Sequence, residues 1–443
     1  MLIPFDRQVF NIVHLGIAFL VIFSADFTVT NMQKTINASI KQDKPWYNVD
    51  GYVSLGLVYL VYGIFLWLAP SVVALVGTKL ALLIGAMGIT IFMFSLTLEI
   101  LYVTYIGIFL TGVGGSFLWV GEGHYVVLNS DPETMSRNVG LFWFLYSSSL
   151  IFGNLYAVFQ LTGKTRIDYD TRHRLLYVLG SLGAIGCILL ALLGPPKRHN
   201  SEIPIRHEGP VQALKKTWKI FRTKKILILL LTFIFGGFQQ SFGGGIYPPS
   251  VGFTQEFGNK AKQLVPMCGL VYGLGDSIVG FCFRTGGLVN MLLRKMRLKI
   301  SKRSIVITGF ILEAIAFCII FINIPSDAVF GETSKTAIIK SNMWLALLSS
   351  FLIGIGDSCL NTQIFPLIAE LHPQFSAHTC ALYKFTKSVS MAIFFFCSNS
   401  LGLHLQLIIL IVLGLIGTIA FVWVDYKESI GKTEKNNTDV TAT

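Results

Sequence analysis

The sequence GIGDSCLNTQ, residues 354–363, places Asp357 in the middle of an apolar run that extends over residues 343–366. Near-copies occur in two other apolar runs, GLGDS at residues 273–277 and GVGGS at residues 112–116. Apolar runs of about 18 residues or more recur along the chain, and each is long enough to cross the hydrocarbon layer of a membrane as a helix. Asp357 therefore lies inside a segment that is expected to cross the membrane.

Composition indicates a membrane protein with many spans. Hydrophobic residues make up 53% of the 443 residues and charged residues 13%, about half the charged fraction of a soluble domain. The first apolar run has neither a basic n-region beyond Arg7 nor a small-residue cleavage site, so it is interpreted as a span rather than a signal peptide. We predict an all-α membrane protein with twelve transmembrane helices, near residues 8–30, 51–70, 78–98, 101–127, 138–160, 174–194, 226–247, 263–283, 304–323, 343–366, 377–400 and 402–424.

The distribution of Lys and Arg predicts the orientation. The segments 195–225 and 284–303 are strongly basic and fall on the same side of the membrane, which the positive-inside rule makes cytoplasmic together with both termini. Residues 163–174 run against the rule, with four basic residues on the opposite side. The net charge of +12 is thus assigned to topology and not to nucleic-acid binding. We expect a multi-pass protein of the plasma membrane or of endolysosomal membranes, with the lipid bilayer as its first partner.

Short internal matches predict two halves. GLVY occurs at residues 56–59 and 269–272, GVGGSFL at 112–118 aligns with GIGDSCL at 354–360, and LFWFLYSSS at 141–149 aligns loosely with ALYKFTKSV at 381–389. Each match is displaced by six predicted spans, which favours two parallel six-helix bundles. The expected units are residues 1–194 and 226–426, a basic linker at 195–225 and a disordered cytoplasmic tail at 427–443. Within the linker, apolar residues at helical spacing predict a short helix on the membrane surface, with a solvated linker as the alternative.

Several of these stretches resemble a known family. Two six-helix halves joined by a long basic connection resemble the major facilitator superfamily, and FGNLY (152–156), APSVVALVG (69–77), NVGLFWFLYSSS (138–149) and GIGDSCLNTQ are similar to its UNC-93-like family. The superfamily implies a secondary transporter of a small solute. The UNC-93-like relatives imply instead an accessory or regulatory partner of an ion channel, or an escort of another membrane protein. The segment SVVALVGTK (71–79) lacks the charged motif that the superfamily usually carries there.

Charged and amide side chains inside the predicted spans are the candidate site. A charge in the middle of a span costs on the order of 3 kcal/mol and almost always faces protein or water. We expect a contact between Asp357 and either Lys384 or Lys387, which share one face of their helix. The full set of cavity candidates for a substrate or coupling ion is Asp357, Asn361, Lys384, Lys387, Asp276, Glu313, Glu122 and Asp26.

Two interpretations of this set remain open. The side chains line a cavity that binds a small solute or ion, or they form buried ion pairs that fix helix register. No metal-ligand spacing and no nucleophile motif occurs, so no enzyme activity, metal or cofactor is predicted. The sequence NAS at Asn37 follows the first predicted span and is expected to be a glycosylation site on the outer side.

Overall fold

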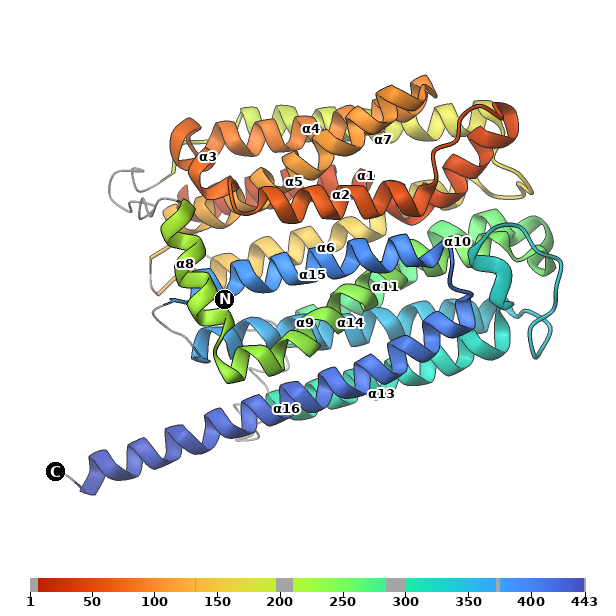
Figure 1. The fold of residues 1–443 in the computed structure, drawn as a ribbon. Helices are drawn as coiled ribbons and strands as arrows, with labels where there is room; N and C mark the ends of the chain where they lie inside the picture. Colours follow the sequence, from red (N-terminus) through yellow and green to blue (C-terminus); the bar gives the residue numbers. More distant parts are fainter. Residues whose placement is uncertain (1–6, 132, 197–209, 284–299, 372–374, 442–443) are drawn as a thin grey trace.

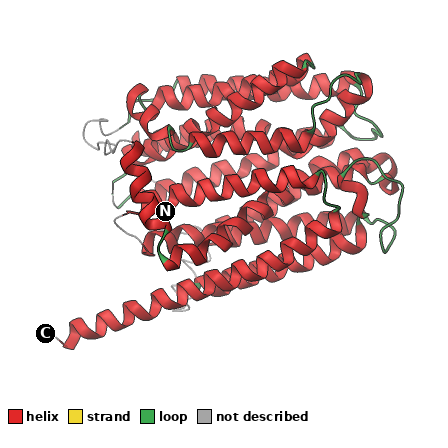
Figure 2. Cartoon of the chain, in the orientation of Figure 1, coloured by secondary structure: helices red, strands yellow, loops and turns green. Residues whose placement is uncertain are grey.

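The computed structural model describes residues 7–131, 133–196, 210–283, 300–371 and 375–441. Long helices lie side by side along one direction (Figure 1), and over these residues the chain is helix and loop (Figure 2). The only extended pairing in the described ranges is an isolated bridge between Thr254 and Thr333. The all-α prediction is confirmed.

The helices form two groups on either side of a linker helix. The first group is α1 (Arg7–Asp43), α2 (Gly51–Phe65), α3 (Ala69–Val76), α4 (Thr78–Leu98), α5 (Leu101–Leu128), α6 (Met135–Gln160) and α7 (Tyr169–Ala191). The linker carries α8 (Pro210–Phe221). The second group is α9 (Lys224–Ser241), η1 (Phe242–Ile246), α10 (Tyr247–Phe253), η2 (Gln255–Lys260), α11 (Ala261–Phe283), α13 (Lys302–Asn323), η3 (Ser326–Val329), α14 (Met343–Leu371), α15 (Ser376–Ser398) and α16 (Leu403–Thr441).

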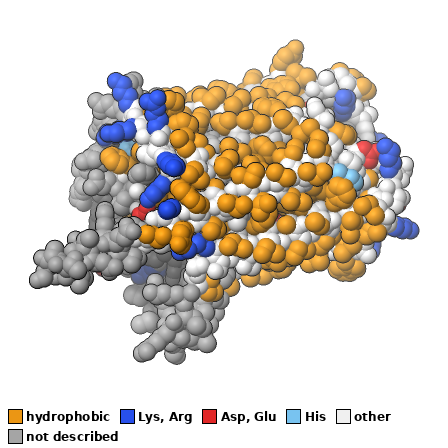
Figure 3. Space-filling view, turned by 60° about the horizontal axis from the view of Figure 1, so that its bottom comes forward, with side chains coloured by type: hydrophobic (Ala, Val, Ile, Leu, Met, Phe, Trp, Pro, Cys, Tyr) orange, Lys and Arg blue, Asp and Glu red, His pale blue; other side chains and the backbone are white. Residues whose placement is uncertain are grey.

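The predicted spans correspond to these helices. Within the described residues, ten helical segments are long and apolar enough to cross a membrane, and α2 with α3, bent by 66°, makes an eleventh. The helix α11 lies at the position of the eighth predicted span. On the face shown in Figure 3, a broad belt of hydrophobic side chains covers the middle of the molecule, and charged side chains lie toward its two ends. We call the end that holds α8 the α8 end, and the opposite one the far end (Figure 1).

The two groups repeat the same packing. In the first, α5 contacts α2 and α4, α1 contacts α6 and α7, and α4 contacts α7. In the second, α14 contacts α11 and α13, α9 contacts α15 and α16, and α13 contacts α16. The principal contacts between the groups are α6 with α11 and α2 with α15. Two parallel six-helix bundles are therefore present.

The first glycines of the aligned sequences GVGGS and GIGDS, Gly112 and Gly354, have equivalent places in the two bundles. A Cβ built on Gly112 of α5 would lie 2.8 Å from the Val58 carbonyl oxygen of α2. A Cβ on Gly354 of α14 would lie 3.1 Å from Tyr272 Cα of α11. Without side chains, these glycines let two helix backbones approach closely. The aligned sequences GVGGS and GIGDS thus serve aligned helix crossings.

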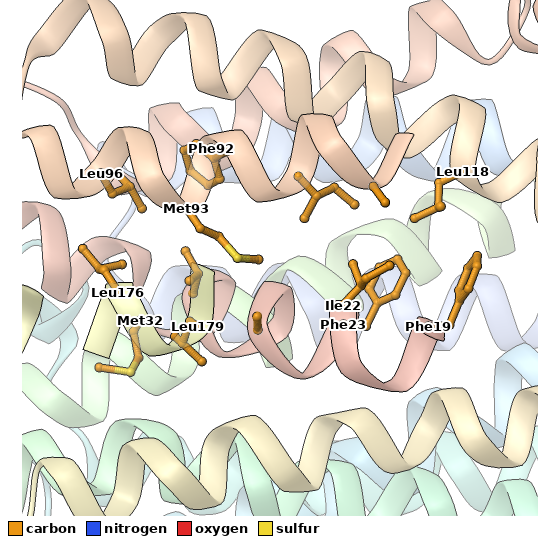
Figure 4. Packing of buried hydrophobic residues seen from close by; sticks show 14 of the residues in the cluster. Phe19, Ile22, Phe23, Met32, Phe92, Met93, Leu96, Leu118, Leu176 and Leu179 are labelled. Atoms are coloured by element: carbon orange, nitrogen blue, oxygen red, sulfur yellow. The ribbon is translucent and has the colours of Figure 1, made fainter. Parts of the chain in front are cut away.

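The amino-terminal bundle is filled by large apolar side chains. Residues from α1, α4, α5 and α7 interdigitate in one cluster (Figure 4), in which Phe19, Met93 and Leu179 are fully buried. Lipid is as apolar as these side chains, so close packing rather than the hydrophobic effect holds the helices together. This rigid core fixes the backbone on which the interior charges are carried.

Two expectations about helix ends are wrong. The helix α1 continues to Asp43 because its polar second half packs inside the protein, where Gln33, Lys34 and Asn37 are buried. Asn37 is only 2% exposed and accepts a hydrogen bond from the Gln33 amide. A glycan requires an exposed acceptor, so the burial of Asn37 argues against the predicted glycosylation.

The carboxyl-terminal tail is helical where disorder was expected, since α16 extends to Thr441. Ion pairs hold the first part of this extension, between Asp425 and Arg303 and between Glu428 and Lys225. Residues 197–209 of the predicted linker, most of the second basic segment at 284–299, and residues 442–443 lie outside the described residues.

Candidate functional site

A chain of hydrogen bonds surrounds the Asp357 carboxylate. The Tyr272 hydroxyl of α11 donates to Asp357 Oδ2 at 2.9 Å, and the Asn361 amide donates to Asp357 Oδ1 at 2.9 Å. Asn361 Oδ1 in turn accepts from Lys387 Nζ at 2.9 Å and from the Tyr383 hydroxyl at 2.8 Å. We call these five residues the Asp357 network. It joins three helices of the carboxy-terminal bundle.

The network corrects the expected ion pair. Lys387 is attracted to Asp357, but its ammonium is hydrogen-bonded to Asn361, which lies one helical turn from Asp357. The amide bridges the two charges because it can donate to a carboxylate and accept from an ammonium at once. Asp357 is 6% exposed, so it points into the protein and not into lipid.

The other two acids of this bundle lie beside the network. Glu313 of α13 is 1% exposed and accepts a hydrogen bond from the Gln239 amide of α9. It also interacts electrostatically with Asp357. Asp276 is 8% exposed, and its main-chain oxygen accepts a hydrogen bond from the Ser358 hydroxyl at 3.0 Å. The three acids therefore form one cluster.

Lys384 faces the other bundle. Its ammonium lies 5.8 Å from the ring centroid of Trp119 on α5, within the range of a cation–π interaction. It is also attracted to Glu122, one turn further along α5 and 7% exposed. The prediction that Lys384 would be an alternative partner of Asp357 is therefore wrong, because its side chain reaches across the interface between the bundles.

Asp26 lies near the middle of α1 and is partly exposed. It interacts electrostatically with Tyr59 of α2, whose ring stacks on Phe395 of α15 at 5.8 Å between centroids. Asp26 thus acts on a residue at the contact between α2 and α15, where the two bundles meet.

An aromatic wall, made by Phe23, Phe27, Trp119, Trp143 and Tyr146, lies between these positions. The Trp119 ring is 5.0 Å from Tyr146 and 5.7 Å from Trp143, and Tyr146 is 5.8 Å from Phe27. Sequence analysis did not assign this wall. Its signal is the aromatic run LFWFLY at residues 141–146.

A polar contact at the far end joins the bundles. The Lys34 ammonium of α1 donates to Asp50 at the start of α2 and to Asn399 Oδ1 at 2.9 Å, just after α15. The Asn399 amide donates back to Asp50 Oδ1 at 2.9 Å. We call these three residues the far-end latch. The feature of the sequence that indicates this latch is Lys34, a basic residue that lies within the helix α1.

The basic segment that departs from the positive-inside rule is neutralised by acids. Arg172, with a fully buried side chain, donates to Glu99 Oε1 at 2.8 Å and to Asp43 Oδ2 at 3.0 Å. Arg166 also pairs with Asp43, and Lys164 pairs with Asp168 at 2.8 Å. The positive-inside rule counts Lys and Arg and is not a net-charge rule, so these ion pairs show how the charges are held in the fold and do not remove the departure.

The fold and its interior charges define a multi-pass membrane protein of the major facilitator type. A solved POT family transporter in complex with 5-aminolevulinic acid superposes with a TM-score of 0.66 at 15% identity, over 94% of this chain and 96% of that chain. The nucleoside transporter NupG superposes with a TM-score of 0.62 at 13% identity, over 95% of this chain and 99% of that chain. These likenesses concern the fold alone.

The chain belongs to the UNC-93 family. The family model described as "Ion channel regulatory protein UNC-93" matches residues 46–422. The UNC93-like protein MFSD11 of Xenopus laevis is 31% identical over 96% of this chain and 97% of its own length.

Proposed function

We propose that the chain is a secondary transporter of a small solute. In this proposal residues 1–194 and 226–426 move as two bodies about the linker, and the α8 end with both termini is cytoplasmic. The observation that carries the proposal is the set of polar and charged side chains held inside the carboxy-terminal bundle, one of which reaches the other bundle. Asp357, Asn361 and Lys387 provide polar groups from one side, and Lys384 reaches the aromatic wall of the other. Charges held inside a membrane protein at such cost often mark the pathway of a substrate or ion.

Alternating access requires contacts that can break. The far-end latch is one such contact, since it joins the bundles by three polar side chains. Hydration of these side chains would offset much of the loss when the bundles separate.

The test is solute uptake into proteoliposomes. We expect Asp357→Asn and Lys387→Met to abolish uptake, because each removes one charge of the Asp357 network. Asp170→Asn and Lys79→Met are matched controls at exposed positions near helix ends, and both should transport normally. Unchanged uptake by the two network variants would remove these residues from the mechanism.

A second function is an accessory or escort role toward an ion channel or another membrane protein. The family description favours it, and so does the uncharged segment at 69–77, which forms the bent helix α3 rather than a charged gating loop. Purification with a stoichiometric channel, together with the absence of uptake in the wild type, would favour this role.

A further inference from the structure

Two charges at the bundle interface have no direct polar partner within the described part of the chain. These are the Asp26 carboxylate of α1 and the Lys384 ammonium of α15, both partly exposed. Neither forms a hydrogen bond or an ion pair with the residues that the structure describes. Both lie well inside their helices, where charges of membrane proteins are normally compensated.

Aromatic side chains lie along the path between these charges. Lys384 lies over Trp119, Trp119 contacts Tyr146, and Tyr146 contacts Phe27, the chain neighbour of Asp26. The centroid distances along this path are 5.8, 5.0 and 5.8 Å. A ligand that reaches from one charge to the other would therefore lie along aromatic rings.

The register of the two charges favours a long ligand. Asp26 acts on Tyr59, which stacks on Phe395 of α15. Phe395 follows Lys384 by eleven residues, a rise of about 16 Å along a helix. An elongated ligand matches this register better than an α-amino acid, whose two charges share one carbon.

Glu122 leaves the Lys384 donors open. It attracts the ammonium, yet no ion pair between them is present in the described residues. Lys384 can therefore donate hydrogen bonds to an incoming carboxylate. The interface holds two acids, Asp26 and Glu122, beside Lys384. A ligand that carries only an anionic group would therefore be repelled by these acids.

We propose that the interface binds an elongated zwitterion, with its carboxylate at Lys384, its ammonium at Asp26 and its apolar body on the aromatic wall. This inference rests on the proposed function and names the class of solute. The opposite charges at the two ends of the wall select against solutes that carry only one of them.

The test is calorimetric titration of the full chain in nanodiscs. The probes are aminooctanoate, with its amine on the terminal carbon, and the singly charged octanoate and octylamine. The wild type should bind aminooctanoate about tenfold or more tightly than either analogue. Lys384→Met should lose about tenfold in affinity for aminooctanoate and octanoate but not for octylamine. Asp26→Asn should show the reverse pattern, and Lys79→Met should match the wild type.

Equal affinity of the wild type for all three probes would overturn the inference, as would variants that weaken all three alike. Failure of transport gives a different result. Charge-selective binding without uptake leaves the zwitterion site standing and defeats only the transport proposal. Uptake of another solute that depends on Asp357, without charge-selective binding, defeats only this inference.

Discussion

Gly356 accommodates Glu313. A Cβ built on Gly356 of α14 would lie 2.8 Å from Glu313 Oε1 and closer still to its Cγ. The Glu313 side chain is buried and held by Gln239, so it cannot move aside freely. In the other bundle, Gly114 has the corresponding place, and its Cβ would lie 2.6 Å from the Gly85 carbonyl oxygen.

Gly356→Ala should therefore destabilise the protein by about 1–3 kcal/mol, the usual cost of overpacking an interior. A lowered melting temperature in detergent is the measurement. Gly123→Ala is the matched control, because nothing lies within 4 Å of a Cβ built there. Alanine is the better helix former, so this control should be neutral or slightly stabilising. A Gly356→Ala variant as stable as Gly123→Ala would contradict the close contact.

Glu99→Gln should be more damaging than either glycine substitution. The substitution removes the carboxylate that pairs with the fully buried Arg172. Breaking a buried ion pair costs about 3–5 kcal/mol. Thermal unfolding of the variant beside Asp170→Asn checks this. Equal melting temperatures of the two variants would show that the ion pair contributes little.

Because of Glu99, the protein should be less stable at acid pH. Burial acts to raise the pKa of Glu99, but hydrogen bonds and charges from Lys44 and Arg172 hold this pKa below its ordinary value. The stabilisation is therefore complete above the unfolded pKa of about 4.3 and is lost as the pH falls through the lower folded pKa. Melting temperatures measured from neutral to acid pH should drop in this window, with a smaller drop in Glu99→Gln. Parallel curves would refute the assignment to Glu99.

The sequence predicts the helices better than the contacts between them. Hydropathy locates the spans because lipid requires long apolar helices, and the ends of the first and the last are far off. In the first helix, polar residues between positions 31 and 39 are buried against other helices, which no local pattern reveals. The charges of the candidate site were predicted from their cost in lipid. Their partners were not, because helical spacing gives the face of a residue and not its distance from another helix. The position of Asn361 between Asp357 and Lys387 could therefore not be predicted from the sequence.

Removal of the far-end latch should loosen the far end. Asn399→Ala deletes the group that connects α15 to Lys34 and Asp50. We expect faster hydrogen–deuterium exchange at residues 31–40 and 395–401, while exchange at the α8 end stays unchanged. Asn48→Ala is the control, since exposed Asn48 contacts Lys41 within one bundle. Identical exchange in both variants would show that the latch does not hold the bundles.

The most direct test of alternating access is the distance between the bundles at the far end. Spin labels at Trp46 and Ile338, which are 74% and 65% exposed, report it by pulsed electron resonance in nanodiscs. Our account predicts a short and a long distance, with the long one enriched by Asn399→Ala and their ratio shifted by aminooctanoate. A single distance, unchanged by the variant and by the solute, would contradict it.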